Sequence, residues 1–281
     1  MPARPPRIAF STLAFPAAPL ADALSLGRSW GYSGVELRLI DGELIDPSMD
    51  AAARTRVRRT LASGGLPVAA LDSSIRLTDD DPLPRLRGFL ALASEWEAPL
   101  VRVFGGELPD ARDGGAARQA RLAAAARVLA AASPAAERLG VAIGVETHDA
   151  FSASSVLAEL LAMPGAAAGG AVWDSHHPHR MGETPAEVAG NLAGRVLLAQ
   201  VKDARRAPGR PGGWQLVLLG EGEVPVPQML ALLLAGGYHG WISVEWEKRW
   251  HPEIEEPEIA LPQHLRVLHR WLETAGTGED A

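Results

Sequence analysis

The sequence contains no cysteine. Disulfides, thiolate metal sites and a cysteine nucleophile are therefore excluded. The chain also lacks any run of about 20 apolar residues, the length that a membrane-spanning helix needs. Its first residues, MPARPPRIAF, contain no apolar stretch long enough for a secretory signal. We therefore expect a cytoplasmic protein with no membrane partner.

Basic residues are fewer than acidic residues in this sequence. The 27 Lys and Arg residues stand against 34 Asp and Glu, which gives a formal net charge of −7 at pH 7. Such a chain has no general attraction for phosphate backbones or acidic membranes. Arg-rich stretches such as Arg54–Arg59 have helical spacing and are interpreted as solvated helix faces. We therefore expect no nucleic-acid partner.

Eight short apolar runs alternate with Ala/Leu/Arg-rich stretches of helical composition. Near-continuous apolar strands are typical of a parallel sheet buried on both faces, and eightfold alternation of strand and helix indicates closure into a barrel. An open doubly wound sheet is the alternative, but no Gly-rich phosphate-binding fingerprint follows the first run. The predicted runs are Ile8–Leu13, Val35–Leu39, Val68–Leu71, Leu100–Phe104, Val141–Val145, Ala171–Trp173, Val196–Val201 and Trp241–Val244.

The predicted fold class is therefore α/β, a (β/α)8 TIM barrel in which a parallel eight-stranded barrel carries helices on its outside. With 281 residues, 47% of them hydrophobic, one such domain over residues 1–281 accommodates the whole chain. Asp46-Pro47 and Asp81-Pro82 predict helix starts in which Asp caps and Pro is the first helical residue. Thr184-Pro185-Ala186-Glu187 adds the Glu of a capping box.

Four oxygen-bearing residues close four successive strands in the second half of the chain. They are Glu146 in VAIGVE, Asp174 in AVWD, Gln200 in VLLAQ and Glu245 in WISVE. Barrels place their chemistry at the carboxyl ends of the strands, where residues distant in sequence meet. Three carboxylates and an amide form a hard, oxygen-rich shell that favours Mn²⁺ or Mg²⁺. We predict that these four residues hold a divalent metal ion, with Co²⁺ or Zn²⁺ compatible if water or His177 joins the shell.

The segments VETHD, WDSHH, QVKDA, LGEGEVP and SVEWEK resemble the motifs of the xylose isomerase-like sugar phosphate isomerase/epimerase superfamily. The resemblance covers essentially the whole chain and is strongest over residues 141–250. It implies an eight-stranded barrel with metal ligands that carry over to Glu146, Asp174, Gln200 and Glu245. Many members have His where this chain has Gln200, whereas hydroxypyruvate isomerases of the superfamily use Gln. In the epimerase branch the two Glu ligands also move the proton, one on each face of the substrate.

These features predict a divalent-metal-dependent sugar or sugar phosphate isomerase or epimerase. A metal bound to a substrate carbonyl and the adjacent hydroxyl stabilises an enediolate. Glu146 and Glu245 are the catalytic candidates for base and acid. A residue outside the metal shell is the alternative for the proton transfer. We expect the substrate to be a small sugar or polyol, and superfamily habit permits a homo-oligomer.

Three other functions compete with this prediction. If a hydroxyl lies β to the enediolate, the same intermediate expels water, as in inosose or dehydroshikimate dehydratases of the superfamily. A metal-dependent lyase is therefore the alternative, and a non-catalytic sugar-binding barrel is the third reading. An apurinic-site endonuclease shares the barrel type but needs three zinc ions and many His ligands, whereas the first His of this chain is His148.

Several side chains near these strand ends are predicted to bind substrate. His177 resembles the superfamily position that contacts substrate oxygens or a metal-bound water. His148 follows Glu146 closely, and Trp246 offers an aromatic face for stacking on a sugar. Lys202 and Arg205 open a Pro/Gly/Arg-rich loop that would cover the site or touch the substrate.

Charged residues also occur within the predicted strands. Arg102 in VRVF places a cation inside the barrel, which requires either a barrel carboxylate or an anionic ligand such as a substrate. Glu36 and Arg38 in VELR are interpreted as an internal ion-pair layer. The complete set of predicted substrate-binding residues is His177, His148, Arg102, Lys202, Arg205 and Trp246.

Overall fold

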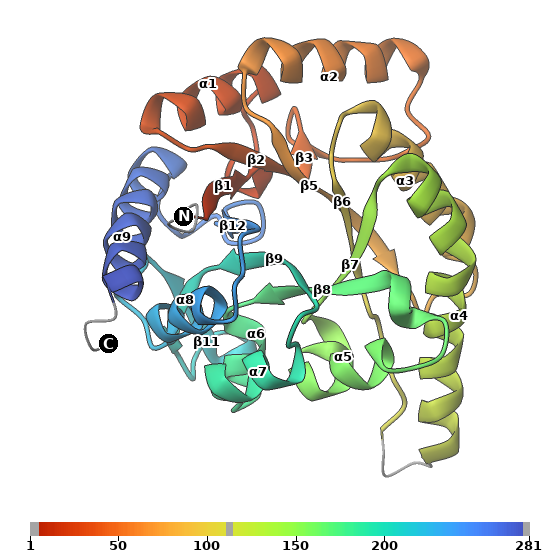
Figure 1. The fold of residues 1–281 in the computed structure, drawn as a ribbon. Coiled ribbons are helices and arrows are strands. Elements are labelled where there is room, and N and C mark those ends of the chain that lie inside the picture. The colour runs from red at the N-terminus through yellow and green to blue at the C-terminus, as the bar shows by residue number, and fades with distance from the viewer. Residues whose placement is uncertain (1–5, 111–114, 278–281) are drawn as a thin grey trace.

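Eight parallel strands close into a barrel in the order β1-β12-β9-β8-β7-β6-β5-β2 (Figure 1). The computed structural model describes residues 6–110 and 115–277. Each predicted apolar run overlaps one barrel strand, which confirms the (β/α)8 prediction. The barrel strands are β1 (Arg7–Ser11), β2 (Gly34–Leu37), β5 (Val68–Arg76), β6 (Leu100–Phe104), β7 (Ala142–Glu146), β8 (Gly169–Asp174), β9 (Val196–Val201) and β12 (Trp241–Val244).

The helices lie outside the barrel. Figure 1 shows α1 and α2 above it, α3 and α4 along the right, α5 to α7 below, and α9 at the left. Within residues 6–110 and 115–277, no helix combines the length and the apolar character that crossing a membrane requires. The helices are α1 (Leu20–Trp30), α2 (Ala51–Gly64), α3 (Leu83–Glu95), α4 (Gly115–Leu139), α5 (Ser154–Leu161), α6 (His176–Arg180), α7 (Pro185–Asn191), α8 (Val226–Ala235) and α9 (Pro257–Thr277).

The three predicted helix starts have different outcomes. The capping box of Thr184 and Glu187 is present at the start of α7. The start at Asp46-Pro47 is wrong, because the Asp46 carboxylate accepts the N–H of Ser48 in a turn and α2 begins only after Asp50. Asp50 is the N-cap, with its carboxylate accepting the N–H of Ala53 at 2.7 Å. Helix α3 begins at Leu83, one residue later than predicted.

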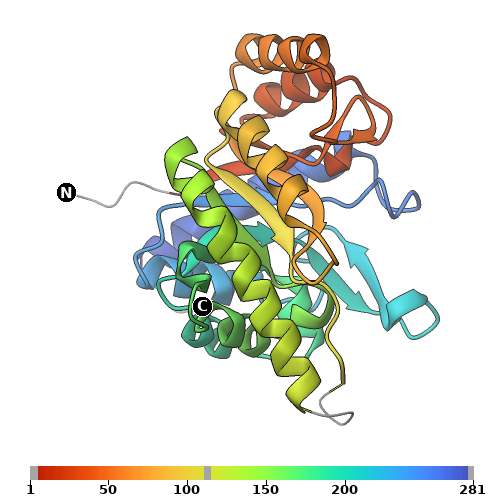
Figure 2. The same cartoon turned by 90° about the vertical axis from the view of Figure 1, so that its right-hand side faces the viewer.

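Two short hairpins interrupt the alternation, and one of them replaces a predicted loop. Strands β3 (Leu39–Ile40) and β4 (Glu43–Leu44) form the first, and β10 (Asp203–Arg206) and β11 (Trp214–Val217) the second. Figure 2 shows the β10–β11 hairpin (cyan) and the loop after β12 (blue) projecting from the same side of the barrel. An ion pair of 2.6 Å between Arg210 and Glu253 joins them.

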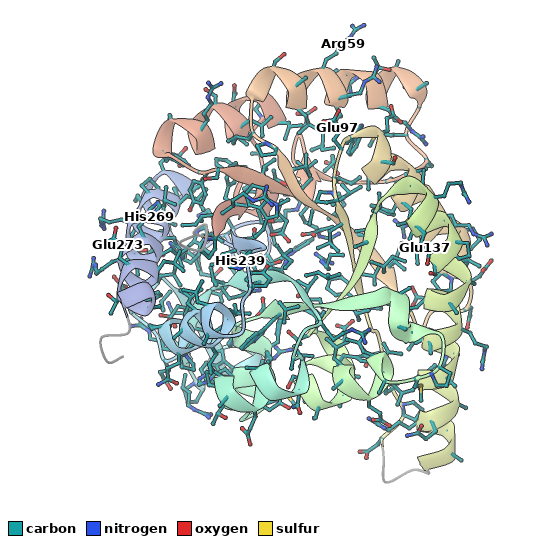
Figure 3. The ribbon with its side chains drawn as sticks, viewed as in Figure 1. Arg59, Glu97, Glu137, His239, His269 and Glu273 are labelled. Atoms are coloured by element: carbon teal, nitrogen blue, oxygen red, sulfur yellow. The ribbon has the colours of Figure 1, made fainter. Side chains whose placement is uncertain are left out.

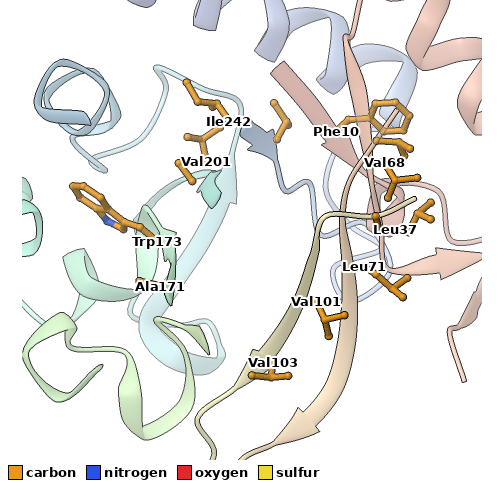
Figure 4. Packing of buried hydrophobic residues seen from close by; sticks show 14 of the residues in the cluster. Phe10, Leu37, Val68, Leu71, Val101, Val103, Ala171, Trp173, Val201 and Ile242 are labelled. Carbon is orange, nitrogen blue, oxygen red and sulfur yellow. The ribbon is translucent and has the colours of Figure 1, made fainter. Parts of the chain in front are cut away.

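Alternate residues of each strand face opposite sides of the barrel wall. Figure 4 shows residues of the outer set, such as Phe10, Val101 and Trp173, in the layer between strands and helices. Charged side chains such as Arg59, Glu137 and Glu273 point outward from the helices into solvent (Figure 3). The other set fills the barrel. Its apolar part is a separate buried cluster: Ala9, Ala69, Ala70, Leu100, Val172, Leu198 and Trp241.

The Trp241 ring needs space that a glycine supplies. A Cβ atom added at Gly34 would lie 2.5 Å from the Trp241 ring, closer than any real contact. Trp241 begins β12, so its ring lies toward the amino ends of the strands. The polar side chains two and four residues further along the same face, Ser243 and Glu245, therefore lie toward the opposite end of the barrel.

Candidate functional site

The four predicted metal ligands meet at the carboxyl ends of their strands. Glu146 and Asp174 are the last residues of β7 and β8, Gln200 lies one residue before the end of β9, and Glu245 follows β12. Carboxylate oxygens of Glu146, Asp174 and Glu245 lie within 4.8 Å of one another. Gln200 Nε2 is 3.4 Å from Glu245 Oε1. All four side chains are buried, so the structure brings together the set that the sequence singled out.

Asp174 is held so that one of its two oxygens faces the site. Its Oδ1 accepts the backbone N–H groups of His176 and His177, at 2.8 Å and 3.1 Å, at the start of α6. Thr147 Oγ1 accepts the backbone N–H of Asp174 at 3.0 Å. Because Oδ1 is occupied in this way, Oδ2 is the oxygen that lies 2.9 Å from the Lys202 ammonium.

Gln200 is held by acceptors from two other strands. Its Nε2 donates to Glu36 Oε1 of β2 at 2.8 Å and approaches Glu245 Oε1. Ser243, which is the register partner of Gln200 on β12, donates its hydroxyl to the other oxygen of Glu36. The prediction that Glu36 and Arg38 form an internal ion-pair layer is wrong. Among the described residues neither side chain forms an ion pair, and Arg38 donates to Ser74 Oγ instead.

The ammonium of Lys202 lies among three carboxylates. It contacts Asp174, Glu245 and Glu247, and the lysine side chain is 2% exposed. Burial opposes its charge, but the three carboxylates outweigh burial and raise the pKa of Lys202 well above the usual lysine value. The predicted substrate-binding residue is therefore a buried cation in contact with two of the predicted metal ligands.

Arg102 pairs with barrel carboxylates, as one of its two predicted roles required. Its Nε is 3.0 Å from Glu146 Oε2 and its Nη2 is 3.3 Å from Asp72 Oδ2. The guanidinium also donates to the backbone oxygen of Ser73 at 2.7 Å. Its Cζ lies 4.2 Å from the centroid of the Phe104 ring. Arg102, which lies on β6, therefore holds the carboxylate of Glu146 in place.

Among the described residues in and around the site, six acidic side chains stand against three basic ones. Burial, followed by the fields of Asp72 and Glu245, raises the pKa of Glu36 well above its usual value. Burial also raises the pKa of Glu245 well above and that of Glu146 above the usual value, although Lys202 and Arg102 oppose these shifts. A bound divalent cation would favour the ionised form of these carboxyl groups. The charged members of the site are Glu36, Asp72, Glu146, Asp174, Glu245 and Glu247 against Arg38, Arg102 and Lys202.

Two histidines line the side of the site next to Glu146. The rings of His148 and His177 meet edge to face with centroids 4.5 Å apart, and His177 Nε2 lies 4.0 Å from Glu146 Oε1. Burial, followed by the field of Lys202, lowers the pKa of His177 well below its usual value, so the ring is neutral. His148 is half-buried and its Nδ1 is hydrogen-bonded to Asp149 at 2.8 Å. Together with Glu146, these rings form a second group that is able to ligate a metal ion.

Two predicted substrate-binding residues lie apart from this cluster. Arg205 is exposed on β10 of the hairpin. Trp246 is fully buried, donates its indole N–H to the backbone oxygen of Glu255 at 2.9 Å, and packs edge-on against His264. Its ring has no exposed surface on which a sugar would stack.

The donor set fits a divalent ion. Glu146 Oε2, Asp174 Oδ2, Gln200 Oε1 and Glu245 Oε2 are buried, yet none of the four accepts a hydrogen bond from the residues that the structure describes. Buried polar atoms in native proteins are normally paired, and each unpaired one requires an explanation. Three of these oxygens are partnered only by the Arg102 or Lys202 cation, and Gln200 Oε1 has no partner among the described residues. Each of the four predicted ligands thus offers one oxygen of the kind that an oxygen-preferring cation binds.

Three further members of the site, Asp72, Ser243 and Glu247, were not predicted from the sequence. Ser243 and Glu247 lie two residues on either side of Glu245, and the same two-residue period places them on one face. That period was available from the sequence. Asp72, in contrast, belongs to a strand that continues to Arg76, five residues beyond the predicted end at Leu71.

Comparison with known proteins agrees with this geometry. The family model described as "Xylose isomerase-like TIM barrel" matches residues 24–272. No curated protein sequence matches the chain. Three solved structures share the fold at 17% identity each. They are L-ribulose 3-epimerase (TM-score 0.74, 96% of this chain and 95% of that chain), the IOLI protein with a bound zinc atom (0.75, 96% and 99%), and the probable 3-DHS dehydratase AsbF from Bacillus anthracis (0.71, 94% and 98%).

The solved structures with this fold include proteins with zinc or with magnesium bound. At such low identity they establish the fold alone. The family model covers most of the sequence and includes all four strand-end oxygen donors. The chain is therefore a member of the xylose isomerase-like TIM barrel family.

Proposed function

We propose that this protein is a divalent-metal-dependent isomerase or epimerase of a small sugar or polyol. The observation that carries the proposal is the meeting of four buried side-chain oxygens, one each on Glu146, Asp174, Gln200 and Glu245, that accept no hydrogen bond from the described residues. Three of them lie beside the Arg102 or Lys202 cation. These residues would hold the ion. When bound, a divalent ion supplies Lewis acidity toward the carbonyl and hydroxyl oxygens of a substrate. The donor set favours Mn²⁺ or Mg²⁺.

Glu146 and Glu245 supply the proton transfer in this proposal. Their raised pKa values move these carboxyl groups toward the range in which a general acid or base works near neutral pH. Arg102 fixes Glu146, and Lys202 contacts Glu245, so each carboxylate is oriented by its own cation. Neutral His177, beside Glu146, is placed to hydrogen-bond a substrate hydroxyl.

Metal binding is the first test. We expect the chelator-treated protein to bind one Mn²⁺ per chain in a calorimetric titration, and Asp174→Asn to weaken that binding at least tenfold, since the change removes a charged oxygen donor. Asp203→Asn is the matched control, because Asp203 is also buried but accepts the backbone N–H groups of Ala204, Gly220, Gly222 and Val224. A wild-type protein that binds neither Mn²⁺ nor Mg²⁺ would exclude the proposed function.

The metal-loaded protein should then be assayed with ketoses, inososes and hydroxypyruvate. An isomer or epimer as the product supports the proposal. A dehydratase is the second candidate, because the same proton removal leads to loss of water where the substrate has a hydroxyl β to the carbanion. The solved structures that share the fold include a probable dehydratase. Formation of a dehydrated product would establish that alternative.

Metal binding should release protons and strengthen as the pH rises. The pKa values of Glu146 and Glu245 are raised in the folded protein, so their contribution to stability is complete below the usual glutamate pKa and is lost as pH rises through the raised values. A divalent ion needs the ionised carboxylates and offsets this loss. Calorimetry between about pH 6 and about pH 8, in two buffers of different ionisation enthalpy, measures both effects. An affinity that falls with pH would contradict this expectation.

A further inference from the structure

Gln200 is the one amide among the four proposed ligands, and its amide has two chemically different ends. Only the carbonyl oxygen is a metal ligand, because the NH₂ group is a donor with no free electron pair for the ion. The proposed metal site therefore requires something that fixes which end faces the ion. This inference rests on the proposed function and concerns how Gln200 serves it.

The surroundings of Gln200 fix that orientation. Nε2 lies 2.8 Å from Glu36 Oε1 and 3.4 Å from Glu245 Oε1, and both of these atoms are carboxylate oxygens. Turning the amide over would place its oxygen against two carboxylate oxygens, an arrangement in which neither side supplies a hydrogen. In the observed orientation Oε1 is buried and accepts no hydrogen bond from the described residues, so it remains available to a cation.

Glu36 is itself fixed. Its side chain is fully buried, and Ser243 Oγ is hydrogen-bonded to Oε2. Ser243 thus occupies Oε2, and Oε1 is the oxygen that accepts from Gln200.

We propose that Glu36 is a positioning residue that selects the oxygen end of Gln200 for the divalent ion. The carboxylate acts on the ion through Gln200, because its two oxygens already have partners in Gln200 and Ser243. This role parallels outer-shell carboxylates that fix the orientation of a metal-ligating histidine. With Gln200 held in this orientation, all four proposed ligands offer an oxygen atom to the ion.

The test compares three variants by Mn²⁺ calorimetry. Glu36→Gln replaces an obligate acceptor with an amide that also donates, so Gln200 loses its fixed orientation. We expect Mn²⁺ affinity to fall roughly 10- to 100-fold, the usual effect of losing an outer-shell partner. The double variant Glu36→Gln/Gln200→Glu has the same composition and charge as the wild type. Its amide at position 36 donates to its carboxylate at position 200, which leaves an oxygen toward the ion. The affinity should return to at least the wild-type value, because position 200 also gains a charged donor.

Asp72→Asn controls for the loss of a buried negative charge. Asp72 is as buried as Glu36 and contacts Arg102 but not Gln200, so this variant should weaken Mn²⁺ binding less than Glu36→Gln does. Circular dichroism of each variant checks folding. If Glu36→Gln binds Mn²⁺ as the wild type does, or if the folded double variant stays as weak as Glu36→Gln, the positioning role is excluded while the metal site stands. If the wild type itself binds no divalent ion, the proposed function fails and this inference fails with it.

Discussion

Replacing Lys202 with methionine is expected to destabilise the metal-free protein by about 3–5 kcal/mol, the usual effect of removing one partner from a buried ion pair. The ammonium contacts Asp174, Glu245 and Glu247, and all three carboxylates would lose their nearest positive charge. Methionine retains the length of the lysine chain, so the change in packing is small. The effect is therefore mainly electrostatic.

A divalent ion should reverse most of this loss. Two of the oxygens that contact Lys202, Asp174 Oδ2 and Glu245 Oε2, are among the four proposed metal-facing oxygens. The ammonium and the ion thus compete for the same negative charge. Lys202→Met should bind Mn²⁺ more tightly than the wild type, and saturating Mn²⁺ should stabilise the variant more than it stabilises the wild type.

Urea unfolding with chelator and with Mn²⁺ measures both quantities. Lys248→Met is the matched control, because Lys248 is also buried but donates to the backbone oxygens of Pro252 and Ile254 and pairs with Glu256. Its loss of stability should be the same with and without the ion. A Lys202→Met variant that loses less than about 1 kcal/mol, the worth of an exposed ion pair, would contradict the prediction, as would a loss that Mn²⁺ leaves unchanged.

Changing either proposed proton-transfer residue is expected to lower kcat by about 10²–10⁴-fold, the contribution typical of general acid–base catalysis. Glu146→Gln and Glu245→Gln retain an oxygen donor and the side-chain volume but cannot take up a proton. The assay should use saturating Mn²⁺, with bound manganese measured in the same sample. Any remaining loss of activity then belongs to proton transfer and not to loss of the ion.

Isotope exchange separates the roles of the two glutamates. If each serves one face of the substrate, each variant should still exchange a substrate proton with heavy water from the face whose glutamate remains, although no epimer forms. One variant should exchange protons of the substrate and the other those of its epimer. If a manganese-loaded variant retains more than a tenth of wild-type kcat, a residue outside the metal shell performs the proton transfer, and His148 is the first to examine.

The fold was predictable because every barrel strand is buried in a similar way. Each strand therefore appears in the sequence as a short apolar run. The four metal-site candidates were predictable for a related reason, since each closes such a run and the barrel geometry determines where the strand ends meet. The β10–β11 hairpin was not predictable in this way. Its strands, DARR and WQLV, carry polar and charged residues, and the hairpin packs through Trp214 against the rings of His176 and His179.

Residue roles that depend on side-chain orientation could not be predicted from the sequence either. Nothing in the sequence VELR distinguishes a Glu36 that pairs with Arg38 from one that accepts a hydrogen bond from Gln200 across the barrel. Trp246 follows Glu245 and therefore faces the opposite side of the wall, where it is buried against His264. The Asp46-Pro47 pair has the composition of a helix start, but a competing cap at Asp50 lies nearer to the helix.

The hydrogen bonds of Glu36 join the two ends of the chain. Its bond with Gln200 spans 164 residues and its bond with Ser243 spans 207. Contacts of such separation form late in folding, because closing the intervening loop costs entropy before the contact stabilises anything. Strand β12, which carries Ser243 and leads into Glu245, also pairs with β1. During synthesis the set of four proposed metal-facing oxygens is therefore complete only when the last strand docks beside the first, and we expect affinity for the ion to appear in the same step that closes the barrel.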